Sequence, residues 1–146
     1  MRMLLHAGIW VDQADGNGAT PLFVACKMDR IAVVRVLLSA NASVDLAGSK
    51  GFTPLCIACQ EGHTEVTSIL LRANAVVDVI TTDGATPLFI ACQGGHAGAV
   101  RLLLDANASV DHPDHDGFTA LCITCEEGHV RVARMLLGAN ACGPGR

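Results

Sequence analysis

Aromatic residues are scarce in this sequence of 146 residues. Phe and Trp make up 3% of it and Tyr is absent, although 51% of the residues are hydrophobic. A core of this composition consists mostly of Ala, Val, Leu and Ile side chains. It favours small, closely packed elements over one large globular centre, and the length is typical of a single domain.

An excess of basic charge is also missing. The formal net charge is −4, and it arises in the second half: residues 1–73 carry six basic and six acidic side chains, whereas residues 74–146 carry four and eight. Nucleic-acid binding needs a basic face, and anionic membranes attract one. We therefore expect neither nucleic acid nor membrane as a partner, and a protein with a basic patch fits the acidic half better.

Long apolar runs are absent as well. The first residues, MRMLLHAGIWVDQ, lack an apolar core long enough for a signal peptide. No run approaches the roughly 18 apolar residues of a membrane span. The sequence thus predicts a cytoplasmic protein, in which the seven cysteines are reduced thiols.

What the sequence does contain is a motif repeated four times. GATPLFVACKMDR stands at 18–30, GFTPLCIACQEGH at 51–63, GATPLFIACQGGH at 84–96 and GFTALCITCEEGH at 117–129, each 33 residues after the last. A catalytic motif normally occurs once. Self-similarity at this period predicts a stacked array of small units.

Each unit contains the signals of two short helices. Thr53 is a helix N-cap, Pro54 suits the first helical position and Gly62 is a left-handed stop. A second helix is expected over 64–72, followed by Asn74 as another left-handed stop. The equivalent asparagines are Asn41, Asn107 and Asn140. Helices of about nine residues are unstable alone in water, so the units must stabilise one another by stacking.

The recurring Thr-Pro-Leu, Gly-His, Leu-Leu and Val-Asp pairs resemble those of ankyrin-repeat proteins. The resemblance covers the whole chain, as a half repeat over 1–12 and repeats over 13–45, 46–78, 79–111 and 112–144. It implies a mainly α solenoid, in which antiparallel helix pairs are joined by β-hairpin loops and the stack has a concave face.

Several positions depart from the family pattern. Asp29 and Arg30 replace the Gly-His pair of the first full repeat, Ala120 replaces a proline, and Gly98 is expected to weaken its helix by roughly 1 kcal/mol relative to Ala. Four further residues stand where the family usually has His: Phe23, Cys56, Phe89 and Cys122.

The cysteine pairs Cys56-x-x-Cys59 and Cys122-x-x-Cys125 have the spacing of two halves of a zinc site. They lie two repeats apart, which places them roughly 20 Å from each other. Zn–S bonds of about 2.3 Å cannot bridge that gap. Four cysteines recur in phase and are expected to be small buried hydrophobic residues: Cys26, Cys59, Cys92 and Cys125.

The histidines also favour structural roles. We interpret His63, His96 and His129, each after a glycine, as hydrogen-bonding residues between helices. The cluster His112, Asp114, His115 and Asp116 is interpreted as a solvated turn in preference to a metal site. The sequence therefore predicts no enzyme and no catalytic, cofactor or metal site.

Function is expected where the repeats differ and side chains point outward. The resemblance places protein binding at the loop tips and on the exposed face of each first helix. Phe52 and Phe118 are candidate anchors if exposed, and the alternative is that they pack between loops. The predicted partner-binding residues are Lys27, Met28, Lys50, Phe52, Glu61, Asp83, His115, Asp116, Phe118, Glu126 and Glu127.

Two other classes of function stay open. The half repeat at the start favours a spacer or regulatory segment of a larger multi-domain protein, with no ligand of its own. A thiol or metal protein that uses the cysteine pairs is the third alternative. Terminal repeats normally carry a polar outer face, but Met3, Leu4 and Leu5 at the start and the pattern VARMLL near the end are apolar. Either the chain is a segment of a longer array, or its ends associate with each other.

Overall fold

The computed structural model describes residues 10–142. Eight α-helices lie in this range, with a 3-10 turn η1 at Ser49–Gly51. The helices are α1 Pro21–Lys27, α2 Ile31–Ser39, α3 Pro54–Glu61, α4 Thr64–Arg72, α5 Pro87–Gly94, α6 Ala97–Asp105, α7 Ala120–Glu127 and α8 Val130–Cys142. The expected half repeat over 1–12 lies almost entirely outside the described residues.

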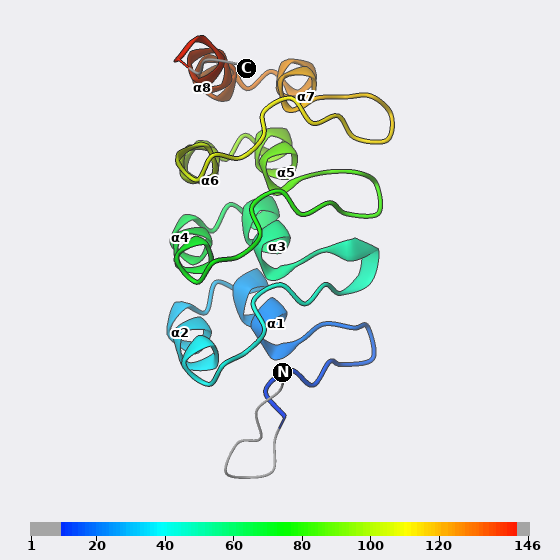
Figure 1. Cartoon of the computed structure of the whole chain (residues 1–146), viewed down its shortest axis with the longest axis vertical. Coiled ribbons are helices and arrows are strands. Elements are labelled where there is room, and N and C mark those ends of the chain that lie inside the picture. Colours follow the sequence, from blue (N-terminus) through cyan, green and yellow to red (C-terminus); the bar gives the residue numbers. More distant parts are fainter. Residues whose placement is uncertain (1–9, 143–146) are drawn as a thin grey trace.

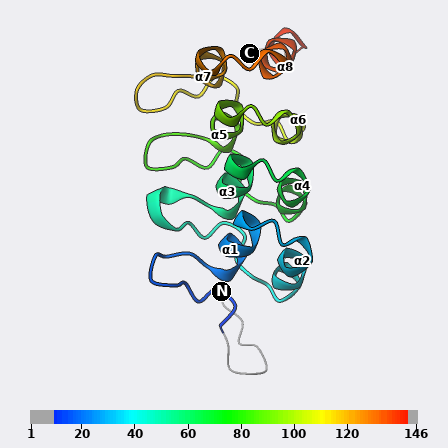
Figure 2. The same cartoon turned by 180° about the vertical axis from the view of Figure 1, so that it is seen from behind.

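The helices form four antiparallel pairs that stack in chain order (Figures 1 and 2). The inner helices α1, α3, α5 and α7 pack on one another, and so do the outer helices α2, α4, α6 and α8. Four tip loops, residues 13–19, 46–52, 79–85 and 112–118, project from the side of the inner helices in both views. No helix of residues 10–142 is long and apolar enough to cross a membrane.

The first helix of each pair begins as the sequence predicts. In every pair a threonine hydroxyl accepts a hydrogen bond from the backbone N–H three residues later; for Thr53 and Cys56 the distance is 3.3 Å. Proline occupies the first turn of α1, α3 and α5. Glycines with positive φ, among them Gly62 at 74°, end α3, α5 and α7. Asp29 takes the equivalent position after α1 with a φ of 60°.

The second helix is confirmed over 64–72, and Asn74 follows it with a φ of 68°. Asn41 and Asn107 are left-handed too. For Asn140 the prediction was wrong, because α8 continues through it to Cys142. At the other junctions the chain beyond the asparagine is held by the preceding pair, as where Asp45 accepts from the Val76 N–H. The neighbouring alanines Ala139 and Ala141 favour helix.

The hydrophobic core lies between the inner and outer rows. Leu22, Leu55 and Leu88 from the inner helices are fully buried. Val66 and Leu70 from the outer row are fully buried too. Packing explains the glycine at position 98 in α6, since an added Cβ would lie 2.7 Å from Thr64 Oγ1. The core therefore runs as a continuous strip along the stack, as the aliphatic composition predicts.

The tip loops turn back on themselves as hairpins without forming β-strands within residues 10–142. In the fourth, the Asp114 N–H donates to the Phe118 carbonyl at 2.8 Å. Neighbouring tips are also joined: the Thr82 N–H donates to the Lys50 carbonyl, and the His115 N–H to the Asp83 carbonyl. The second, third and fourth tips thus form one connected edge.

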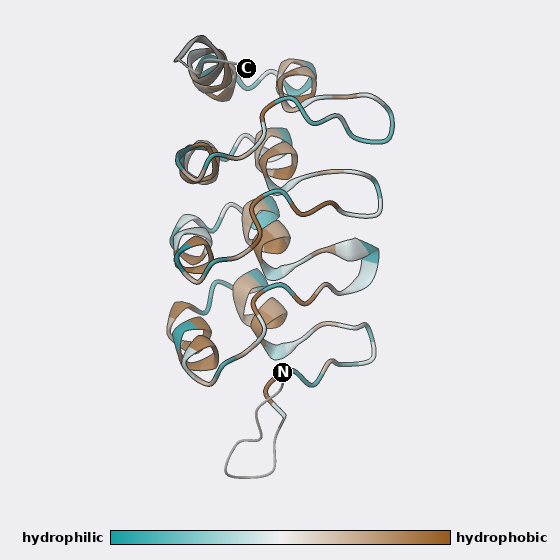
Figure 3. Ribbon diagram, viewed as in Figure 1, coloured by the Kyte–Doolittle hydropathy of each residue, from teal (hydrophilic) through white to brown (hydrophobic). Residues whose placement is uncertain are grey.

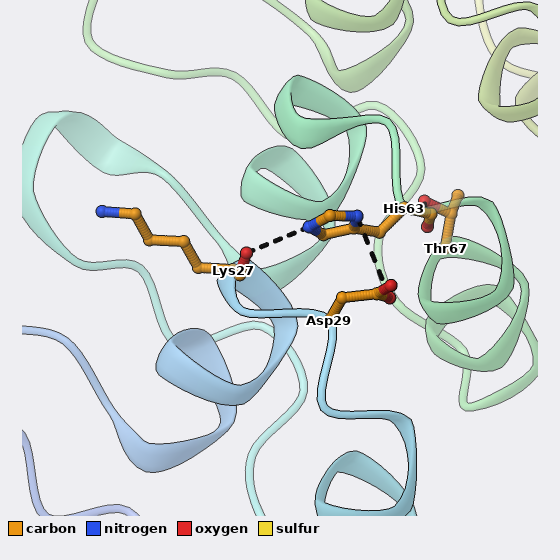
Figure 4. Close-up of polar contacts among 4 residues, drawn as sticks. All are labelled: Lys27, Asp29, His63 and Thr67. Atoms are coloured by element: carbon orange, nitrogen blue, oxygen red, sulfur yellow. Dashed lines mark hydrogen bonds and ion pairs between the residues drawn. The ribbon is translucent and has the colours of Figure 1, made fainter.

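The recurring histidines join consecutive pairs, which confirms their structural role. His63, His96 and His129 donate from Nε2 to the carbonyls of Lys27, Gln60 and Gln93, each at 3.0 Å. Each acceptor lies at the end of the preceding inner helix. At the first junction the carboxylate of Asp29 also lies 3.9 Å from Nδ1 of His63 (Figure 4).

Candidate functional site on the concave face

A hollow of about 560 Å³ lies in the angle between the tip loops and the inner helices. We call this angle the concave face. The hollow spans the second, third and fourth pairs. Its lining is Phe52, Gln60, Thr81, Asp83, Ala85, Phe89, Ile90, Gln93, Asp114, His115, Asp116, Phe118, Ile123 and Glu126.

The structure brings six of the predicted partner-binding residues together around this hollow. They are Phe52, Asp83, His115, Asp116, Phe118 and Glu126. The other five predicted residues are exposed but do not line it: Lys27, Met28, Lys50, Glu61 and Glu127. Met28 lines a separate apolar recess beside Val24 and Val33 at the first pair.

The two candidate aromatic anchors differ in exposure. Phe118 is 39% exposed. Phe52 is only half-exposed and packs against the core. Phe118 is therefore the more exposed of the two rings, although both line the hollow.

The fourth tip loop is held in shape by Asp114. Its Oδ1 accepts from the N–H of Asp116 at 3.0 Å and from the N–H of Phe118 at 2.9 Å. This turn fixes the backbone on which both side chains are displayed. In the second tip loop Gly48 replaces the aspartate, and Lys50 takes a left-handed conformation with a φ of 61°.

Sequence reasoning missed three residues that form the apolar floor of the hollow. They are Phe89 and Ile90 from α5 and Ile123 from α7, none of which is among the predicted partner-binding residues. Each is about 6% exposed, so little of each side chain reaches the hollow. The phase of the repeat could have identified two of them. Ile90 and Ile123 occupy the same repeat position, one residue before the recurring Ala or Thr of the first helix.

The cysteines offer little chemistry inside the stack. Burial raises the pKa of Cys26 to about 12 and of Cys92 to about 11, and it raises the pKa of Cys59. Cys26, Cys59 and Cys92 are buried as predicted, but the prediction was wrong for Cys125, which is exposed. No following inner helix covers its side of α7 within the described range.

Metal binding at the tips finds no support in the geometry. No group of three or more His, Cys, Asp or Glu side chains in residues 10–142 is arranged to hold a metal ion. At the fourth tip, one carboxylate oxygen of Asp114 is already engaged by two backbone N–H groups.

A family model described as ankyrin repeats (three copies) matches residues 1–81 and 73–144. The chain belongs to the ankyrin-repeat family. No curated protein was found to match it. Ankyrin repeats are generally protein–protein interaction modules, and the family is typically non-catalytic.

Proposed function

We propose that this ankyrin-repeat chain binds another protein through its concave face and that Phe118 anchors the contact. The observation that carries the proposal is the hollow itself. Three consecutive tip loops and three inner helices contribute to it, and it has an apolar floor with carboxylates at the rim. Partner surfaces bind best where a few large side chains are desolvated in the centre of a polar rim.

The energetic argument separates two kinds of residue on this face. Side chains that recur in every pair, such as Leu55 and Leu88, are buried in the stack and are unavailable to a partner. Side chains that differ between pairs, such as Lys50 and Asp116 at equivalent positions, are exposed at the tips. A rigid stack that displays variable side chains in a fixed arrangement binds with little loss of conformational entropy.

The test compares two double variants of the full chain as baits in a native cell lysate, with retained proteins identified by mass spectrometry. The first, Asp116→Lys/Phe118→Ala, alters the concave face. The second, Val36→Ala/Asp105→Lys, removes an exposed apolar side chain and reverses an exposed carboxylate on the outer helices α2 and α6. Circular dichroism establishes that both are folded.

We expect a protein retained by the wild type and by the outer-helix variant to be lost with the concave-face variant. A protein lost only with the outer-helix variant would move the site to the opposite side. If all three baits retain the same proteins, the concave face does not bind, and the chain is better explained as a spacer or regulatory segment of a larger protein.

A further inference from the structure

The concave face is electrically polarised along the stack. The expected contact positions carry Lys27 in the first pair, a cancelling Lys50 and Glu61 in the second, and Asp83 in the third. The fourth pair carries three carboxylates: Asp116, Glu126 and Glu127. All seven side chains are exposed. With Asp15 of the first tip loop and Asp114 of the fourth included, the formal charge is zero, zero, −1 and −4 along the stack, so the face becomes more acidic towards the fourth pair.

The acidic end is not neutralised from within. Among the described residues, the ion pairs are Arg35–Glu65 on the outer helices and His63–Asp29 at the first junction. Neither involves Asp83, Asp116 or Glu126, and no lysine or arginine lines the hollow. In Figure 3 the tip loop of the fourth pair is correspondingly the most continuously hydrophilic of the tip loops.

The apolar part of the hollow also suits a positively charged ligand. Phe118 lines the hollow together with Asp116 and Glu126, and the residue is 39% exposed. A guanidinium group binds well where a carboxylate and the face of an aromatic ring are both within reach. This end of the hollow is therefore suited to an arginine side chain.

The repeat spacing sets a matching spacing for the ligand. Asp83 and Asp116 occupy equivalent positions in adjacent loops, whose tips are joined by the hydrogen bond from His115 to Asp83. Adjacent pairs of helices lie about 8–10 Å apart. A segment in the extended polyproline II conformation advances about 3.1 Å per residue with three residues per turn, so side chains three residues apart share one face and lie about 9 Å apart. Basic side chains three residues apart would meet successive carboxylates.

We infer that the partner presents an extended segment with a basic end and an acidic or neutral end, which lies along the concave face in one orientation. The basic end, with arginines three residues apart, lies over the third and fourth pairs, and the other end lies over Lys27 and Lys50. This inference rests on the proposed function and adds the chemistry and the orientation of the ligand.

The probe is a synthetic fluorescein-labelled peptide of twelve residues, with aspartates near one end, arginines at positions 8 and 11 and small neutral residues elsewhere. A peptide of the same composition with arginines at positions 8 and 9 is the spacing control. Fluorescence anisotropy with the full chain at low ionic strength measures both dissociation constants. We expect the three-residue spacing to bind several-fold more tightly, because only it reaches two carboxylates.

Two variants of equal charge separate local contacts from net charge. Asp83→Lys/Asp116→Lys alters the tips, and Glu65→Lys/Asp105→Lys makes the same change on the outer helices. We expect the tip variant to weaken binding of the first peptide about ten-fold and the outer variant to have a much smaller effect. Equal effects, equal affinities for the two spacings, or no saturable binding would overturn the inference.

The orientation is read by NMR with a paramagnetic label on the peptide. A label at the basic end should broaden amide signals of residues 115–118, and one at the acidic end those of residues 16–28. The reverse pattern, or broadening of both regions by either label, contradicts a single orientation. If the lysate test identifies a concave-face partner without a basic segment, the proposed function stands and this inference fails.

Discussion

The second and fourth pairs have almost the same first-helix sequence, GFTPLCIACQEGH at 51–63 and GFTALCITCEEGH at 117–129, yet their cysteines lie in different surroundings. Cys56 and Cys59 are fully buried, because α5 packs over α3. Cys122 and Cys125 are exposed, since no described helix covers α7 on that side. The comparison shows that the neighbouring repeat, and not the motif, determines whether a side chain belongs to the core.

The same contrast appears in the chemistry of the thiols. Desolvation raises the pKa of Cys56. Hydrogen bonds from Thr119 lower the pKa of Cys122, whose thiol accepts from the threonine hydroxyl at 3.3 Å. One sequence pattern therefore gives a buried thiol and an exposed thiol whose pKa values shift in opposite directions.

Thiol reactivity should show the largest difference between the two pairs. We expect iodoacetamide to modify Cys122 at least about a thousand-fold faster than Cys56 at neutral pH, because Cys56 reacts only after the stack opens. Mass-spectrometric mapping of the alkylated peptides over time measures each cysteine separately. Similar rates at both sites would mean that α5 does not protect α3.

Alkaline pH should destabilise the stack through its buried thiols. The folded-state pKa values of Cys26 and Cys92, about 12 and 11, lie above the ordinary value of about 8.5, so their contribution is complete below pH 8.5 and is lost as pH rises towards the folded values. These two thiols alone should lower the free energy of unfolding, from urea titrations, by about 5 kcal/mol between pH 8.5 and 11, and the raised pKa values of Cys56 and Cys59 add to the fall.

Two double variants locate the groups responsible for this pH dependence. Cys26→Ala/Cys92→Ala should make the fall shallower without abolishing it, since each alanine removes a group that titrates only on unfolding while Cys56 and Cys59 remain. Cys122→Ala/Cys125→Ala should leave it nearly unchanged, because these thiols are exposed. An equal flattening in both variants would contradict the contrast between the interior and the fourth pair.

Leucine truncation sharpens the comparison in the core. Leu55 is fully buried, whereas the equivalent Leu121 is only partly buried. We expect Leu55→Ala to reduce the free energy of unfolding by about 3 kcal/mol and Leu121→Ala by about 1 kcal/mol, because less contact is lost at the second site. Urea denaturation measures both, and a larger loss for Leu121→Ala would contradict this account.

Histidine substitution should show no such contrast. His96 and His129 each donate to a carbonyl of the preceding pair at 3.0 Å. Neither bond depends on a following pair of helices. We expect His96→Ala and His129→Ala each to cost about 1 kcal/mol. His115→Ala is the control, as the His115 side chain makes no hydrogen bond within the described residues. Unequal losses at the two junctions would show that the repeats are not equivalent there.

The smallest expected effect comes from a substitution that removes a difference between the second and fourth pairs. Ala120 begins α7 where Pro54 begins α3, and Thr119 before it is already extended with a φ of −92° and a ψ of 171°. A proline is therefore compatible with the backbone. We expect Ala120→Pro to raise the free energy of unfolding by about 0.5 kcal/mol by restricting the unfolded chain. A loss of stability would show that the first turn of α7 differs from that of α3.

The sequence predicts the structural features that depend only on a residue and its near neighbours in the chain. Thr53, Pro54 and Gly62 bound α3 where expected, since capping and left-handed conformations depend on a few adjacent residues. The resemblance to ankyrin repeats added the stacking of the pairs. The histidine bonds followed from the phase of the repeat.

What the sequence could not predict depends on contacts between repeats. Cys125 keeps the phase of Cys59 but lacks a covering helix. Asn140 keeps the phase of Asn74, yet α8 continues through it. Of the two rings at equivalent positions, Phe52 packs against the core and Phe118 remains more exposed. In each case the local pattern is the same and the neighbouring structure differs.

Site-specific photo-crosslinking tests the central claim, that the concave face is the binding surface, most directly. A photoreactive amino acid is placed at position 118 in one protein and at position 36, on the outer helix α2, in another. Both are irradiated in native lysate and analysed by mass spectrometry. The account predicts a covalent adduct with a specific protein from position 118 and none of that protein from position 36. An adduct from position 36 alone would contradict it.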